Sequence, residues 1–395
     1  MGRKRRNGEG SWGKRKINNS IYFFFKDPNG KFTYGKTEGE VREKLKAKEK
    51  AAKENAVVYD AKLTVGEYVK DWLYKKKFPE VGLTLEATTF DCYESALAKR
   101  FYTYPVANMQ MAALDKTALQ NYLKDLAKKY SRGSIQKTWQ VIKMCLTDDE
   151  YVHYDCVPAI NFKKIQIPSE KNVAVKKKKN QFTSSEEMEL LYTEALRKTQ
   201  TGSYYYGNAA RLLAFIMYSG LREAEAAGLR WRDVDVEKGL VAINQTHTQI
   251  KSRDENGMKI GYEYINKDPK SDASSATIPY KRRAGEILEI MEAMYPLRKK
   301  NDYIFLSDNR TPLKKRHILH TLKRMLKNTG LEEKNYTVHD LRHGYGSILL
   351  KEGADITTIS RLLRHGEIST TADIYIGTTP NDLKMLLDKV EEDDK

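Results

Sequence analysis

The sequence predicts a chain of several domains that is mainly α-helical and carries small β-sheets. At 395 residues the chain is longer than a single-core domain usually is, so two or three domains are expected. Apolar residues recur at helical spacing through most of the chain, whereas strand-like runs gather near the N-terminus and at about 240–280. A change of composition at 163–179, which holds seven lysines and one acid, marks a linker between domains.

The N-terminal domain is expected to cover 1–60. The run SIYFFFKDPNGKFTYGKT contains two aromatic, strand-like segments, and Asp27-Pro28-Asn29-Gly30 between them is a typical turn. The charged stretch EGEVREKLKAKEKAAKEN that follows has a helical composition but few large apolar residues. We therefore expect a small sheet plus one helix.

The second domain, 61–168, is expected to be helical. Thr64 and Glu67 form a capping box, in which each side chain bonds the backbone N–H of the other residue. Apolar side chains follow at helical spacing, namely Val65, Tyr68, Val69, Trp72 and Leu73. Further helices are expected at 86–100, 115–129 and 133–147, and no pattern in this domain is typical of catalysis.

A basic linker, 169–180, is expected to lead to a third domain at 181–380. That domain begins with another capping box, formed by Thr183 and Glu186. Helices then alternate with a strand-rich insertion at about 240–280. The closing segment, 381–395, carries apolar residues on one helical face and is expected to form a tail helix.

The charge of the chain points to a polyanionic partner. Lys and Arg number 70 against 53 Asp and Glu, a net charge of +17 at pH 7, which is typical of a protein that binds nucleic acid. Lysine runs are often only solvated, but in a basic protein they are also candidates for contact with DNA phosphates. The candidates lie in the N-terminal lead-in and in the linker: Lys14, Arg15, Lys16, Lys176, Lys177, Lys178 and Lys179.

Other classes of protein lack support in the sequence. The three cysteines, Cys92, Cys145 and Cys156, stand at no metal-ligand spacing and suit a reducing cytosol. No apolar run is long enough to span a bilayer, and no hydrophobic segment follows the basic N-terminus. The sequence contains no Walker A, HExxH or paired-cysteine motif. We expect a soluble, cytoplasmic protein without a metal or nucleotide cofactor.

Two segments place cationic side chains where they could bind one anion. In VHDLRHGYGSILL, 338–350, His339 and Arg342 are three residues apart, about 60° around a helix axis and off its apolar stripe. Arg222 follows Ser219-Gly220 at a helix start, where backbone amides favour an anion. Two guanidiniums and an imidazole at one point are suited to a phosphate group.

A second histidine and a tyrosine complete this set. In DITTISRLLRH, Asp355 is the N-cap of a helix that ends at His365, and Tyr375 follows ten residues later. A phosphodiester attacked by a tyrosine oxygen passes through a pentacoordinate state with extra negative charge, which fixed cations would stabilise. A tyrosine nucleophile also keeps the phosphate in a reversible covalent link.

Three short motifs follow one another along the chain: Gly220-Leu-Arg222-x-x-Glu225, His339-x-x-Arg342, and His365 with Tyr375 ten residues later. In this order they resemble the signature of the tyrosine recombinases, or phage-type integrases. The layout is most similar to that of integrases of conjugative transposons. The resemblance implies an arm-type DNA-binding domain at 1–60, a helical core-binding domain at 61–168 and a mixed α+β catalytic domain at 181–380.

The resemblance also implies a role for each residue. Arg222 and Arg342 would clamp the non-bridging oxygens of the scissile phosphate. His339 and His365 would assist proton transfer or hydrogen-bond the phosphate. Tyr375 would be the nucleophile, giving a 3′-phosphotyrosyl link and a free 5′-hydroxyl.

In the family, a lysine in a β-hairpin is the general acid for that hydroxyl. The run NKDPKSDASSATIPYKR resembles this hairpin and implies Lys270, with Lys267 as the rival. Glu225 matches the acidic position of the family, which is expected to be a structural buttress. The chain departs from the family pattern at Arg364, where glycine is common, and at Gly377, where histidine often follows the tyrosine.

The function implied is that of a site-specific DNA recombinase that integrates or excises a mobile element in a bacterial cytoplasm. It would act as a homotetramer on double-stranded DNA with core and arm sites, with an accessory factor for excision. The tail at 381–395 would dock on its own domain or on a neighbouring subunit. The alternatives are a type IB topoisomerase and a non-catalytic DNA-binding regulator. The arm-like domain favours recombination, because relaxing supercoils needs no second DNA site.

Overall fold

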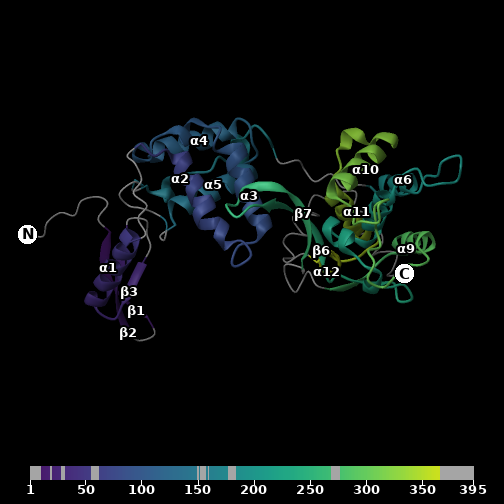
Figure 1. The fold of residues 1–395 in the computed structure, drawn as a ribbon, viewed down its shortest axis with the longest axis horizontal. Coiled ribbons are helices and arrows are strands. Elements are labelled where there is room, and N and C mark those ends of the chain that lie inside the picture. Colours follow the sequence, from purple (N-terminus) through teal and green to yellow (C-terminus); the bar gives the residue numbers. More distant parts are fainter. Residues whose placement is uncertain are drawn as a thin grey trace, which may run out of the picture. The chain divides into compact units, whose positions relative to one another are not determined.

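The structure is a computed structural model, and it describes residues 10–17, 20–27, 32–54, 62–148, 151, 157–158, 160–176, 184–267 and 276–364. The chain divides into two compact units, and many of their elements are labelled in Figure 1. Unit 1 consists of Met1–Lys177 and Lys251–Gly261, and unit 2 of Lys178–Ile250 and Tyr262–Lys395. Several predicted features lie outside the described residues: Lys177, Lys178, Lys179, Lys270, His365, Tyr375 and the tail at 381–395.

Unit 1 begins with an antiparallel sheet of β1 (Ser11–Ile17), β2 (Ser20–Lys26) and β3 (Phe32–Gly35), in the order β1-β2-β3. Helix α1 (Glu38–Glu54) packs on β2 and β3 and fully buries Val41. The predicted sheet and helix are confirmed. The sheet has one more strand than predicted, because the basic lead-in pairs with β2 and its Trp12 ring lies 5.2 Å from that of Phe25.

The helical part of unit 1 follows the predicted pattern closely. It contains α2 (Val65–Asp71), α3 (Ala87–Arg100), α4 (Lys116–Ala127) and α5 (Arg132–Leu146). The capping box of α2 is confirmed, since Thr64 Oγ1 accepts the Glu67 N–H at 3.2 Å and the Glu67 carboxylate accepts the Thr64 N–H at 2.9 Å. Helix α2 continues directly into a π-helical turn, Trp72–Lys77, whose Trp72 is fully buried in the core.

A distant part of the chain also belongs to unit 1. Residues Lys251–Gly261 bring Arg253 against α3, where it forms ion pairs with Asp91 and Glu94. Although burial raises the pKa of Glu94, Arg253 and Lys251 lower it to about 2. These charged groups fix the tip of a β-hairpin on α3.

Unit 2 is built around α7 (Asn208–Ser219), every residue of which is buried. The mainly apolar sequence of α7 suits a central position. Four helices of 11 to 14 residues pack against it: α6 (Ser185–Ala195), α9 (Arg282–Met294), α10 (Lys315–Asn328) and α11 (Val338–Lys351). Two short helices, α8 (Glu223–Gly228) and α12 (Ile356–Leu363), carry or adjoin residues of the candidate site.

The strands after α8 confirm the predicted strand-rich insertion. β4 (Val234–Asp235), β5 (Leu240–Ala242) and β8 (Thr277–Pro279) form an antiparallel sheet in the order β4-β5-β8. Between β5 and β8, the long strands β6 (Thr246–Arg253) and β7 (Lys259–Lys267) pair as a separate two-stranded sheet.

The capping box predicted for α6 is wrong by one residue. The box is formed by Ser184 and Glu187, with the Ser184 N–H donating to the Glu187 carboxylate at 2.8 Å. The run TSSEE fits the capping-box spacing in two registers, so spacing alone does not choose between them. A distant contact favours Glu187, because its carboxylate also accepts the Tyr336 hydroxyl at 2.8 Å.

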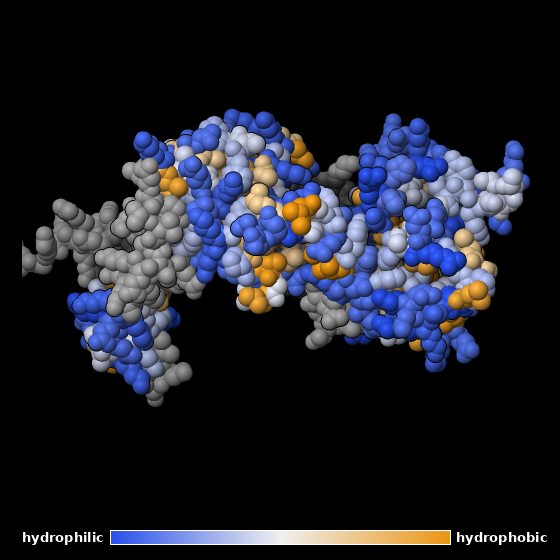
Figure 2. All heavy atoms as spheres, viewed as in Figure 1, coloured by the Kyte–Doolittle hydropathy of each residue, from blue (hydrophilic) through white to orange (hydrophobic). Residues whose placement is uncertain are grey.

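The surface of the described chain is mostly polar. Hydrophilic side chains cover most of the face in Figure 2, and hydrophobic ones form small separate patches on it. Helix α10 exposes a group of cations to solvent, namely Lys315, Arg316, Lys323, Arg324 and Lys327. Over the described ranges, no helix combines the length and apolar character needed to cross a membrane.

Candidate active site

Arg222 lies where α7 gives way to α8. Helix α7 ends at Ser219, and Gly220 turns the chain with a φ of +67°, which glycine adopts readily. Space also requires glycine here, because a Cβ would lie 2.6 Å from the Tyr345 ring. Arg222 is the N-cap of α8. Glu225, one turn later, accepts the Arg222 backbone N–H at 2.8 Å and its Nη1 at 2.7 Å.

Arg342 reaches the same place from α11. Its side chain is only 1% exposed, although the sequence places it off the apolar stripe of this helix. Burial is possible because backbone carbonyls receive the guanidinium. Nη1 donates to the Gly220 carbonyl at 2.6 Å, and Nη2 donates to the Leu363 carbonyl at the end of α12.

His339 lies one turn before Arg342 and keeps an exposed ring. The ring meets that of buried His343 edge-on, with centroids 4.2 Å apart. Desolvation by the surrounding groups, and then the charge of Arg342, lower the pKa of His339. Burial, and then the neighbouring His339 and Arg342, lower the pKa of His343 to about 4. Both imidazoles are therefore neutral at pH 7, and His339 can accept a proton there.

Arg364 joins the cluster from the C-terminal end of α12. It is 3% exposed and adopts a left-handed conformation, with φ +51° and ψ +49°. Its Nη2 forms an ion pair with Glu225, and its carbonyl accepts Arg222 Nη2 at 3.1 Å. Burial raises the pKa of Glu225, but Arg364 and Arg222 hold it below its usual range. The carboxylate therefore stays ionised, and among the described residues it is joined by ion pairs to both arginines.

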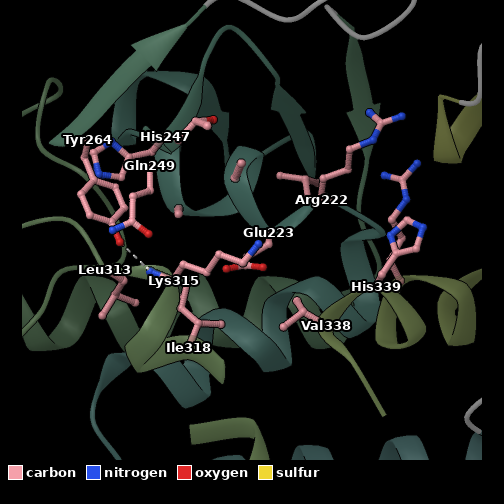
Figure 3. A pocket seen from close by; sticks show the side chains of 15 residues that line it. Arg222, Glu223, His247, Gln249, Tyr264, Leu313, Lys315, Ile318, Val338 and His339 are labelled. Atoms are coloured by element: carbon pink, nitrogen blue, oxygen red, sulfur yellow. Dashed lines mark hydrogen bonds between the residues drawn. The ribbon is translucent and has the colours of Figure 1, made fainter. Parts of the chain in front are cut away.

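The predicted groups open into a cavity of about 460 Å³ (Figure 3). Figure 3 shows Arg222 and His339 close together at one side of the cavity, with His247 and Tyr264 on the opposite side. The polar lining is Arg222, Glu223, His247, Thr248, Gln249, Tyr264, Lys315, His339 and Arg342. Such a wall of guanidinium, imidazole and ammonium groups is suited to a phosphodiester.

The structure therefore brings together three of the six predicted catalytic residues, Arg222, His339 and Arg342. The other three, Lys270, His365 and Tyr375, lie outside the described residues. Lys267 is the last residue of β7 and is not among the residues that line the cavity. No group of His, Cys, Asp or Glu in the described ranges could hold a metal ion.

The predicted DNA contacts remain predictions where the structure describes them. Lys14 and Arg15 are exposed on β1, and Lys14 Nζ lies 4.7 Å from the centre of the Phe23 ring. Lys16 lies on the same strand. Lys176 is exposed, and its Nζ donates to the carbonyls of Glu170 and Lys171.

The sequence does not single out two other members of the site. His343 follows Arg342 directly, and its spacing of four residues from His339 is the signal that could have paired the two rings. Arg364 stands out in the sequence only as a departure from a family pattern. Its partner Glu225 is 139 residues away, and no local spacing indicates such a contact.

Comparisons with known proteins agree with this geometry. Residues 181–381 match the phage integrase family. A tyrosine recombinase XerC-like protein of Caldanaerobacter subterraneus is 26% identical over 377 residues, covering 90% of each chain. Transposase A from transposon Tn554 of Staphylococcus aureus is 28% identical over 192 residues, covering 46% of this chain and 47% of the relative.

A solved structure is similar over most of the chain. It is that of the Tn1549 transposon integrase in complex with transposon right end DNA, with a TM-score of 0.63 and 16% identity. The match covers 83% of this chain and 100% of the other. At this identity the likeness establishes the fold.

The buried His343 should make stability depend on pH. Its pKa is lowered to about 4 in the folded chain and is about 6.5 when unfolded, so the unfolded state binds the proton more tightly. The stabilising difference is complete above about pH 6.5 and is lost as the pH falls towards 4, by up to roughly 3 kcal/mol. His343→Gln should flatten the pH dependence of the urea unfolding midpoint between pH 7 and 4.5.

The matched control is His320→Gln on the exposed side of α10, which should keep the wild-type pH dependence. Only the slope with pH is compared, so a constant loss of stability in either variant does not affect the test. Equal slopes for wild type and His343→Gln would contradict the neutral, buried state of His343.

Proposed function

Since this chain belongs to the phage integrase family of tyrosine recombinases, we propose that Tyr375 cuts its DNA while Arg222, His339 and Arg342 hold the scissile phosphate. The chain is a site-specific DNA recombinase and binds DNA. The single observation that supports the proposal most is that Arg222, His339 and Arg342 line one cavity, with Arg222 held by an ion pair to buried Glu225.

Arg222 and Arg342 differ in how they would meet a phosphate. The Arg222 side chain is 37% exposed and lines the cavity, so a non-bridging oxygen can approach it directly. Arg342 is 1% exposed and donates to two carbonyls, so it also braces the wall against which the phosphate would rest. Cations fixed in this way stabilise negative charge without reorganising during the reaction.

The proposed step transfers the phosphate from one oxygen to another. The Tyr375 oxygen attacks phosphorus and gives up its proton, for which neutral His339 is an acceptor within the cluster. The bond from phosphorus to the 5′-oxygen breaks, leaving a 3′-phosphotyrosyl link. Lys270 donates a proton to the departing 5′-oxygen, and attack by a 5′-hydroxyl of another strand reverses the step and rejoins the DNA.

Tyr375→Phe should bind DNA as well as wild type but form no covalent adduct, because the attacking oxygen is gone. The measurement is adduct formation on a nicked suicide substrate, resolved on a denaturing gel. The control is Tyr345→Phe, which should keep wild-type adduct formation. Tyr345 is 2% exposed, and burial raises its pKa to about 12, so it is not a competing nucleophile. Adduct formation by Tyr375→Phe would assign the nucleophile to another residue.

Lys270→Ala should slow cleavage by on the order of a hundredfold, because the leaving 5′-oxygen then departs without a proton. Cleavage should recover when that oxygen is replaced by sulfur, which leaves readily as a thiolate. Lys267→Ala is the matched variant and should cleave unmodified DNA without the sulfur replacement. If Lys267→Ala alone is rescued, Lys267 is the general acid, and if neither is rescued, the acid is not a lysine of this hairpin.

We extend the proposal to assembly on DNA, with four copies joining two core sites, an accessory factor for excision, and the β1-β2-β3 sheet bound to a separate arm site. In support of this, Lys14 and Arg15 are exposed on β1. Their double alanine variant should lose protection of the second site in a footprint and lower the salt dependence of binding by about two phosphate contacts. The control is Arg42→Ala with Lys46→Ala on α1. Unchanged protection and salt dependence would rule out this contact.

A further inference from the structure

Arg364 occupies a backbone position that does not suit it. Its φ of +51° and ψ of +49° are left-handed, and an L-residue with a Cβ is disfavoured in this conformation. Glycine at the end of α12 would fit the same turn without strain. The reason for an arginine at this position therefore lies in its side chain.

The side chain ends on the carboxylate that orients Arg222. Nη2 of Arg364 forms an ion pair with Glu225 Oε2, while Glu225 Oε1 accepts Arg222 Nη1 at 2.7 Å. Arg364 and Glu225 are each 3% exposed, so water screens this pair little. The two arginines thus hold opposite oxygens of one buried carboxylate.

The backbone of Arg364 meets Arg222 a second time. Its carbonyl accepts Arg222 Nη2 at 3.1 Å, so both terminal nitrogens of Arg222 are held, one by Glu225 and one by Arg364. A guanidinium bound at two nitrogens has a fixed plane. The plane of Arg222 is therefore set jointly by Glu225 and by the end of α12.

The side chain of Arg364 also changes the net charge around Arg222. Arg222 and Glu225 alone would form a neutral pair, and the carboxylate would compete with a phosphate for Arg222. With Arg364 added, two positive groups share one negative group and the trio keeps a charge of +1. Burial strengthens this effect because the charges interact at low local dielectric.

We propose that Arg364 is a positioning residue that offsets the charge of Glu225, so that Arg222 is held in place and remains available to the scissile phosphate. The inference rests on the proposed function of Arg222. Arg364 itself does not touch the substrate. It acts through Glu225 and through its own carbonyl.

The experiment compares single-turnover adduct formation at saturating protein for Arg364→Met, Arg364→Lys and Arg364→Gly on a nicked suicide substrate. Arg364→Met, which removes the charge and keeps the length, should cleave roughly tenfold or more slowly, with DNA affinity within about threefold of wild type. Arg364→Lys, which keeps the charge, should recover part of the rate. Arg364→Gly should also cleave slowly although it relieves the backbone strain. Arg361→Met, exposed on the same helix, is the control and should cleave as wild type does.

Two readouts separate this role from a loss of folding. First, adding Glu225→Gln to Arg364→Met removes the unbalanced carboxylate, so the double variant should cleave faster than Arg364→Met alone. Second, a neutral methylphosphonate at the scissile position demands less positive charge, so the difference between wild type and Arg364→Met should shrink on that substrate.

The inference is overturned if Arg364→Met or Arg364→Gly cleaves at the wild-type rate. It is equally overturned if the loss is the same on phosphate and methylphosphonate and Glu225→Gln restores nothing. If Arg364→Met does not fold, Arg364→Lys and Arg364→Gly decide the question by the same comparison. Failure of the wild-type chain to form any adduct would instead refute the proposed function.

Discussion

The proposed active site depends on one buried carboxylate. Glu225 is 3% exposed, yet its pKa stays below the usual range because Arg364 and Arg222 surround it. It caps α8 through the Arg222 backbone N–H, orients the Arg222 side chain and receives Arg364 from the end of α12. Glu225 therefore fixes the start of α8, the side chain of Arg222 and the distant end of α12. Removing one partner of such a network leaves a buried charge without compensation.

The fold supplies this carboxylate with its neighbours by burying α7. Because α7 is buried along its whole length, its end at Gly220 is held inside unit 2, between α11 and α12. The ring of Tyr345 on α11 and the side chain of Leu363 on α12 both lie close to Gly220. The same crowding places the Gly220 carbonyl 2.6 Å from Arg342 Nη1. Packing of an apolar helix thus determines where the polar groups of the site converge.

Much of this could be predicted from the sequence where local spacing decides the structure. A capping box and apolar periodicity define α2, helical patterns indicate α4 and α11, and three ordered motifs identify Arg222, His339 and Arg342 as one site. Features that depend on distant partners could not be predicted in this way. Strand β1 forms because β2 pairs with it, and the register of the α6 cap depends on Tyr336. Arg342 is buried because it donates to a carbonyl 122 residues away.

The arginines of the site also donate hydrogen bonds to the last backbone carbonyls of α12. The last carbonyls of a helix have no partner within it, and here Leu363 and Arg364 accept Arg342 Nη2 and Arg222 Nη2. A phosphate oxygen attracts the same nitrogens more strongly than a neutral carbonyl does. In the proposed mechanism the helix end keeps both guanidiniums in place, and a bound phosphate would use their remaining N–H donors. In the sequence, the chain continues from this end to His365 and to Tyr375, the proposed nucleophile, so the proposed phosphate site directly precedes the segment that would carry the attacking oxygen.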